Sequence, residues 1–167
     1  PFNQQLLRQL KLQSGEYAES RSVIHSVSTN SGGDHFVIGM QEVFIPKGGM
    51  QGRNQPERRN MIISYDWATG QETKRVPLRF RVDGMAMGPG PSNVAYFSTD
   101  SRTIEMLNME TAVVTSSVSV DERPSYIKLS DDNDYLAVGT VAGNVYLYEV
   151  IRNNPAEIKI LRPSMKR

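Results

Sequence analysis

The sequence predicts an all-β fold built from repeated four-stranded antiparallel sheets. Short strand-like runs alternate with polar turns along most of the chain, and the pattern recurs at a spacing of 42 residues between Met85 and Ile127. Runs of β-branched and aromatic residues bounded by Gly, Pro, Asn and Asp are typical of strands joined by tight turns. A period near 42 residues with four strands in each unit is typical of a protein assembled from stacked repeats.

The third unit shows the pattern most clearly. Its first three strand-like runs cover residues 125–130, 135–140 and 145–150. The segment 131–134, Asp-Asp-Asn-Asp, predicts a turn, because these side chains bond their own backbone. The run from Tyr135 to Val138 is apolar at consecutive positions, which predicts a strand packed between two neighbouring layers.

The two earlier units repeat this order of strands and turns. The second unit has runs at 84–88, 94–98 and 103–108, and the first has runs at 23–27, 35–39 and 61–66. Each unit also has a fourth run that follows its third, at residues 72–80, 112–120 and 156–161. The run 112–120 alternates polar and apolar residues, which is typical of a half-exposed edge strand.

These runs divide the chain into five segments. They are an N-terminal segment (1–21), a first unit with an insertion at 44–60 (22–80), a second unit (81–120), a third unit (121–161) and a basic tail (162–167). In the N-terminal segment, Leu6, Leu7 and Leu10 fit one face of a helix, whereas Leu10-Lys11-Leu12 fits a strand. We favour a strand that belongs to a further unit.

The ends of the third strands carry a resemblance to a known family. They read Tyr65-Asp66 followed by Thr69-Gly70, then Leu107-Asn108, then Tyr148-Glu149, and the second strand at 136–140 reads Leu-Ala-Val-Gly-Thr. The chain resembles the WD40-repeat family over roughly residues 20–161, because that family places Trp-Asp, and often Thr-Gly, at the end of the third strand. The resemblance implies a partial β-propeller of three four-stranded antiparallel blades.

The sequence also departs from the WD40 pattern. No Gly-His dipeptide precedes a first strand, and Ala142 occupies the turn position where the family has Asp. The family's Asp-His-Ser/Thr-Trp network therefore cannot form, and we expect apolar packing to hold the blades. A closed propeller needs about four to eight blades. We therefore expect the missing blades elsewhere in the natural polypeptide or in a partner chain.

Composition narrows the function classes. The chain has 19 basic and 18 acidic residues, a net charge of +1, and no cysteine, which excludes disulfides and thiolate metal sites. No catalytic or phosphate-binding motif is present, and no run is long enough to span a bilayer. We expect a non-enzymatic protein without cofactor or metal, in a cytoplasmic or other intracellular setting.

The insertion at 44–60 is the most unusual stretch. Lys47, Arg53, Arg58 and Arg59 oppose the single Glu57, which gives a net charge of +3. Guanidinium groups pair with carboxylate or phosphate, so these four residues are the candidate partner-binding residues. The alternative interpretation is a surface insertion without function.

Other candidates have simpler interpretations. The aspartates of 131–134 lack the spacing of a calcium loop, so a solvated turn is the favoured interpretation. Only two histidines are present, His25 and His35, whereas metal sites use three or four ligands. Tyr65 and Trp67 are expected in the core between blades. The basic C-terminal segment is interpreted as a solvated tail.

These observations favour a non-catalytic protein-interaction scaffold that is part of a multisubunit assembly. The alternative is a propeller that binds nucleic acid or phosphoinositide through the basic insertion. The near-neutral net charge and the scarcity of aromatic residues in the basic stretches argue against nucleic acid.

Overall fold

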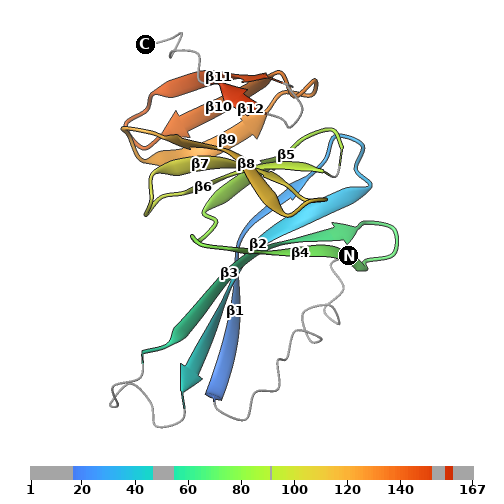
Figure 1. The fold of residues 1–167 in the computed structure, drawn as a ribbon, viewed down its shortest axis with the longest axis vertical. Coiled ribbons are helices and arrows are strands. Elements are labelled where there is room, and N and C mark those ends of the chain that lie inside the picture. The colour runs from blue at the N-terminus through green and yellow to red at the C-terminus, as the bar shows by residue number, and fades with distance from the viewer. Residues whose placement is uncertain (1–16, 47–54, 91, 152–156, 160–167) are drawn as a thin grey trace.

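The computed structural model describes residues 17–46, 55–90, 92–151 and 157–159. These ranges hold twelve strands and no helix that could cross a membrane (Figure 1). The strands of the first sheet are β1 (Tyr17–Thr29), β2 (His35–Pro46), β3 (Glu57–Asp66) and β4 (Glu72–Leu78). Those of the second are β5 (Gly84–Met87), β6 (Asn93–Ser98), β7 (Thr103–Asn108) and β8 (Val113–Ser119). Those of the third are β9 (Pro124–Leu129), β10 (Tyr135–Thr140), β11 (Val145–Ile151) and β12 (Glu157–Lys159).

Each sheet is an antiparallel meander in which consecutive strands are neighbours. The three four-stranded sheets and their positions in the chain confirm the predicted fold class. The predicted turn at 131–134 is also confirmed, with Asn133 at a φ of 61°. Asparagine accepts this left-handed conformation more readily than most residues, which explains its place in the turn.

Two predicted boundaries change. The first sheet begins at Tyr17, within the segment 1–21 that was assigned to a further unit. The insertion at 44–60 is shorter than predicted. Strand β2 continues to Pro46 and β3 begins at Glu57, and Phe44 pairs with Glu57. The segments 10–12 and 162–167 lie outside the described residues.

The sheets stack face to face in chain order, and apolar side chains fill the spaces between them (Figure 1). We call the side of a sheet that looks toward the next sheet its forward face, and the other side its backward face. The first interface packs Val37, Ile62 and Val76 of the first forward face against Met85, Val94, Tyr96 and Leu107. The second packs Ala86, Ala95, Phe97, Ile104 and Met106 against Ile127, Leu129, Leu136, Val138 and Tyr148.

Hydrogen bonds repeat along with the apolar packing. In every sheet the turn between the first two strands accepts a backbone bond from the end of the third strand. The pairs are Trp67 N to Asp34 O (2.8 Å), Met109 N to Ser92 O (2.6 Å) and Val150 N to Asp134 O (2.8 Å). This bond fixes each turn against its own sheet at the same place in the repeat.

A carboxylate before the first strand supplies a second repeated contact. Asp83 Oδ2 accepts bonds from the Thr99 backbone N (2.7 Å) and from Thr99 Oγ1 (2.6 Å). In the third sheet Glu122 accepts bonds from Thr140 Oγ1 (2.6 Å) and Asn144 Nδ2 (2.7 Å). These carboxylate–threonine pairs tie the segment before the first strand to the end of the second, in a chain that lacks the WD40 network.

The Asp83 contact predicts a pH-dependent contribution to stability. Burial raises the pKa of Asp83, but the bonds from Thr99 and Arg81 outweigh it and hold the pKa below its usual value. A depressed folded-state pKa adds stability that is present above the unfolded-state value of about 3.9 and is lost as pH falls below it. We expect Asp83→Asn to lower the free energy of unfolding by roughly 1–3 kcal/mol at pH 7.

The difference between Asp83→Asn and wild type should shrink as pH falls below about 4. Urea titrations between pH 3 and pH 7 measure it. Asp100→Asn, at a carboxylate that is largely exposed, is the matched control. A constant difference over this pH range would contradict the role of the Asp83 carboxylate.

The second interface predicts a strong effect at Leu136, which is 1% exposed on β10. In Leu136→Asp a carboxylate would be buried without a partner, at a cost of about 4 kcal/mol or more. We expect the third sheet to lose its cooperative thermal transition and its hydrogen-exchange protection. Tyr135→Asp changes the neighbouring position on the open face and should melt nearly as wild type does.

Candidate partner-binding surface

The first sheet extends beyond the other two as a three-stranded arm. Its strands β1, β2 and β3 have 13, 12 and 10 residues, whereas the strands of the second sheet have four to seven. We define the arm as residues 20–24, 41–46 and 57–60. It points away from the end of the stack formed by the third sheet (Figure 1).

The pairing register arranges the arm in rows across its three strands. Ser20, Phe44 and Glu57 form one row, and Ser22, Glu42 and Arg59 form the next row on the same side. The rows between them lie on the opposite side. The irregular pairing between Ile24 and Ser26 leaves His25 as an extra residue where the arm leaves the sheet. Such a bulge bends its strand and increases the local twist.

Apolar packing and charge hold the backward face of the arm together. Phe44 is 2% exposed, and the guanidinium of Arg59 lies 4.8 Å from its ring centroid. Arg59 Nε also donates to Glu57 Oε1 at 2.6 Å. Arg59 therefore contributes to the structure of the arm through a cation–π contact and an ion pair.

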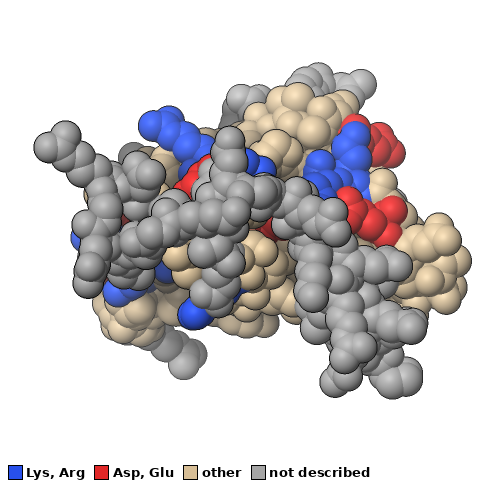
Figure 2. All heavy atoms as spheres, turned by 90° about the horizontal axis from the view of Figure 1, so that it is seen from below, with Lys and Arg blue, Asp and Glu red and all other residues tan. Residues whose placement is uncertain are grey.

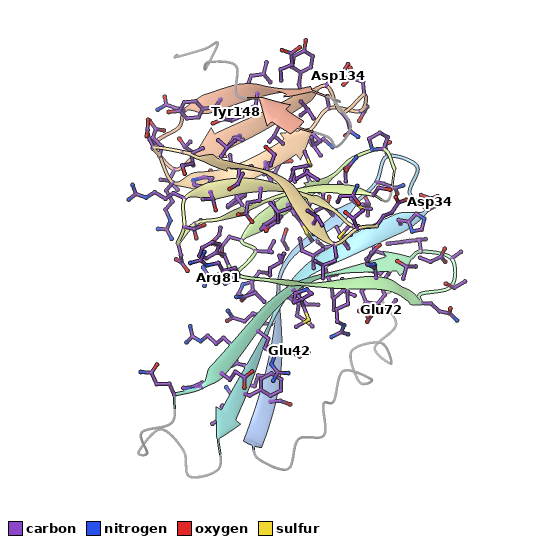
Figure 3. The ribbon with its side chains drawn as sticks, viewed as in Figure 1. Asp34, Glu42, Glu72, Arg81, Asp134 and Tyr148 are labelled. Carbon is purple, nitrogen blue, oxygen red and sulfur yellow. The ribbon has the colours of Figure 1, made fainter. Side chains whose placement is uncertain are left out.

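Glu42 lies on the same face and is buried (Figure 3). Its Oε1 is 3.8 Å from Arg75 Nη1. Arg75 in turn donates to Glu72 from Nε (3.0 Å) and Nη2 (2.8 Å). The hydrogen bonds to Glu72 and the nearby carboxylates raise the pKa of Arg75. This cluster links the arm to β4.

The forward face of the arm carries the exposed arginines. Arg21 and Arg58 pair across Val43 in one row, and both arginines are exposed. Val23 follows in the next row on this face and is also exposed. In the body of the sheet the same face is covered, because Val82, just before β5, packs against Gly39, and the second sheet packs on Val37 and Ile62. The arm continues this face beyond the end of the second sheet.

The two predicted basic residues that the structure describes do not share a face of the arm. Arg58 and Arg59 lie on strand β3 and, being consecutive, on opposite faces of the arm. Lys47 and Arg53 lie outside the described residues. In the view onto this end of the molecule, lysine and arginine lie beside aspartate and glutamate (Figure 2). The sequence did not reveal Arg21 as a neighbour of Arg58, because the two belong to strands far apart in the chain.

The metal-site, histidine and aromatic candidates from the sequence can also be located in the fold. Within the described ranges no three His, Asp or Glu side chains are grouped as a metal site. His25 is partly buried, and burial together with Arg81 lowers its pKa. Tyr65 is buried and stacks on Phe36 at 5.0 Å, but both rings lie on the backward face of the first sheet, so its predicted place between two blades is wrong. Trp67 is exposed, so its predicted place in the core is wrong: it lies edge-on to Phe36, just past the end of β3.

A groove of about 450 Å³ runs beside the first strands of the three sheets. It is lined by residues of β1, β5 and β9, among them Ser28, Met85 and Tyr126. The groove follows the first strand of each sheet, and its lining brings together no concentrated set of catalytic groups among the described residues.

Comparison with solved structures supports this description of the fold. The Hsv2 structure from Kluyveromyces marxianus matches with a TM-score of 0.57 and 11% identity over 85% of this chain and 38% of that chain. The Cps50 (Swd1) β-propeller domain from Myceliophteria thermophila matches at 0.56 and 11%, over 91% and 42%. Kuenenia stuttgartiensis hydrazine synthase matches at 0.56 and 13%, over 89% and 36%.

The chain thus has the fold of part of a β-propeller and spans well under half of the structures it matches. The sequence matches no protein-family model and no curated protein. Identities this low establish the fold and leave the function to be argued from the surface.

We expect the paired strands of the arm to contribute to stability and the segment 47–54 between β2 and β3 to contribute little. Replacing residues 47–54 with a short Gly-Asn turn should change stability little, because closure entropy varies by only about 0.6 kcal/mol per doubling of loop length. Phe44→Ala should destabilise the protein by roughly 3–5 kcal/mol, since it removes a buried ring. Val43→Ala on the opposite face should cost less.

Thermal and urea unfolding of the three variants measure these effects. Removal of the whole segment 44–60 should resemble Phe44→Ala, because that segment contains paired strand residues. Equal stability of Phe44→Ala and wild type would show that the ring does not anchor the arm.

Proposed function

We propose that this chain is a non-catalytic protein-interaction module of a propeller, and that the forward face of its arm contacts an acidic partner. The observation that carries this proposal is the row formed by Arg21, Val43 and Arg58. It places two exposed arginine side chains on either side of an aliphatic side chain, on a three-stranded ribbon that extends beyond the second sheet.

The chemistry of this row fits a protein surface. Arginine binds carboxylates through two parallel hydrogen bonds, and it remains charged at any physiological pH. Val43 between the two adds apolar area, as interfaces combine apolar contact with charged edges. A carboxylate-bearing segment with an aliphatic or aromatic residue between its acidic groups would match all three side chains.

A nucleic acid or a phosphoinositide is the competing partner class. Phosphate binding along a nucleic acid would call for a continuous positive surface, whereas the described forward face of the arm offers a single row with two arginines, Arg21 and Arg58. The described arm also presents no exposed aromatic side chain on which a base could stack.

Several features support a non-catalytic role. The described residues bring together no nucleophile with a base and an orienting acid, which acyl transfer needs. The carboxylates that are held closely, Asp83 and Glu122, bond to threonine and asparagine side chains of the same sheet. We interpret both as structural groups.

The first test identifies the partner. A photo-crosslinking residue in place of Val43 should label a bound protein in a cell extract, and the same residue in place of Val113, which is exposed on β8, is the control. We expect a protein labelled from position 43 and not from position 113. Equal labelling from both sites would argue against a specific contact at the arm.

The second test measures the arginines. Arg21→Gln with Arg58→Gln should weaken binding of the crosslinked protein by roughly tenfold and flatten its salt dependence. Arg102→Gln with Arg123→Gln removes the same charge from turns of the other sheets and should change binding little. Single-stranded DNA and phosphoinositide vesicles serve as competitors. Displacement of the protein by either would favour the phosphate alternative.

A further inference from the structure

The forward face of the arm carries apolar side chains along its middle strand. Val43 and Ile45 are forward-facing residues of β2, two positions apart, and both are partly buried. Such same-face neighbours on one strand lie about 6.8 Å apart. Gln41 is the next forward-facing residue toward the body of the sheet. Its Nε2 donates to Asn60 Oδ1 at 2.8 Å, so the apolar line ends there in a pair of amides.

Two arginines flank this apolar line from the outer strands of the arm. Arg21 of β1 and Arg58 of β3 both pair with Val43, and both side chains are exposed. Because neighbouring strands lie about 4.8 Å apart, the two arginines leave the ribbon about 9.6 Å from each other. The surface is therefore apolar along its middle and positively charged on both sides.

An α-helix has the dimensions and the pattern to match this surface. Its diameter with side chains is roughly 10–12 Å, close to the separation of the two arginines. Successive residues are turned by about 100°, so residues i+1 and i+4 form a stripe and residues i and i+5 lie on its two sides. A helix with an apolar stripe and acidic sides complements an apolar line between two arginines.

An extended segment fits the same surface less well. If its successive side chains reached the two arginines, its backbone N–H and C=O groups would lie on Val43 without hydrogen-bond partners. If it crossed the strands, its same-face side chains would repeat every 6.8 Å or so, whereas the strands below repeat at about 4.8 Å. If it paired with the outer edge of β1, it would meet Arg21 and remain two strands away from Arg58.

We infer that the occupant of the arm is an acidic amphipathic helix that lies lengthwise over Val43 and Ile45. One carboxylate beside its apolar stripe pairs with Arg21, and another on the opposite side pairs with Arg58. The apolar line has two residues, so the contact covers about two helical turns. This inference rests on the function proposed for the arm, and it specifies the secondary structure and the residue spacing of the acidic partner.

Two synthetic helical peptides test the spacing. Both have an alanine and glutamine background and leucines at i+1 and i+4. The matched peptide has glutamates at i and i+5, whereas the control peptide has them at i and i+7, on one side of the helix. By fluorescence anisotropy with the full chain, we expect the matched peptide to bind roughly tenfold more tightly. Equal binding, or tighter binding of the control peptide, would overturn the lengthwise helix.

Charge reversal identifies the contacts on each side. Arg58→Glu should weaken binding of the matched peptide by roughly tenfold, and lysine in place of one of its two glutamates should restore binding. Arg21→Glu should be restored by lysine at the other position. Arg102→Glu, at an exposed turn residue of the second sheet, should leave binding unchanged. Melting curves check that each variant is folded. Restoration of both variants by the same peptide, or of neither, would contradict the inference.

A third peptide separates the helix from the acidic contact itself. It has the composition of the matched peptide except for two central prolines, which prevent a helix. If it bound as tightly as the matched peptide and lost binding with Arg21→Gln and Arg58→Gln, the helix would be overturned and the proposed acidic contact would stand. If no peptide bound, the helix would also be overturned. The crosslinking test, which requires no helix, would then decide the function proposed for the arm.

Discussion

Face-to-face packing of apolar sheet surfaces is the constraint on which the rest of this structure depends. Each strand alternates its side chains between the two faces of its sheet, so a sheet in the middle of the stack must be apolar on both sides. The second sheet shows this, with Tyr96 and Leu107 on its backward face and Phe97 and Met106 on its forward face, all buried. Removal of either neighbour would expose one of these sets.

The repeat explains why the end of the stack differs from its middle. The third sheet has the same alternation as the second, but Tyr135 and Leu147 are exposed because nothing described covers them. Such a surface is costly for an isolated domain and useful for assembly, since apolar area is buried when the next layer binds. The hydrogen bonds from threonine side chains to Asp83 and Glu122 add polar contacts within a single sheet, which do not depend on the neighbouring sheets.

The arm obeys the same pairing rules with a different result. Strands β1, β2 and β3 extend beyond the edge of the second sheet. Their forward face is therefore covered at Gly39 and exposed at the row that contains Arg21 and Arg58. One sheet thus serves as a structural layer at one end and presents charge at the other. On the backward face of the arm, the Arg59 guanidinium packs over the buried Phe44 ring.

The sequence by itself determined the number of strands in each unit, their order and the turn at 131–134, because period, β-branched runs and Asp/Asn turns are local signals. It could not place Arg21 beside Arg58, nor separate Arg58 from Arg59, since these depend on the pairing of distant strands. Pro46 and the nearby glycines made 44–60 resemble a loop in the sequence. In the structure, pairing with β1 and burial of Phe44 extend strand β2 into this segment. The continuous apolar run at Tyr135 indicated a strand with two neighbours, and only the tertiary structure showed that one face is open. Local sequence encodes which faces are apolar, and the layers present in the fold decide which of them are covered.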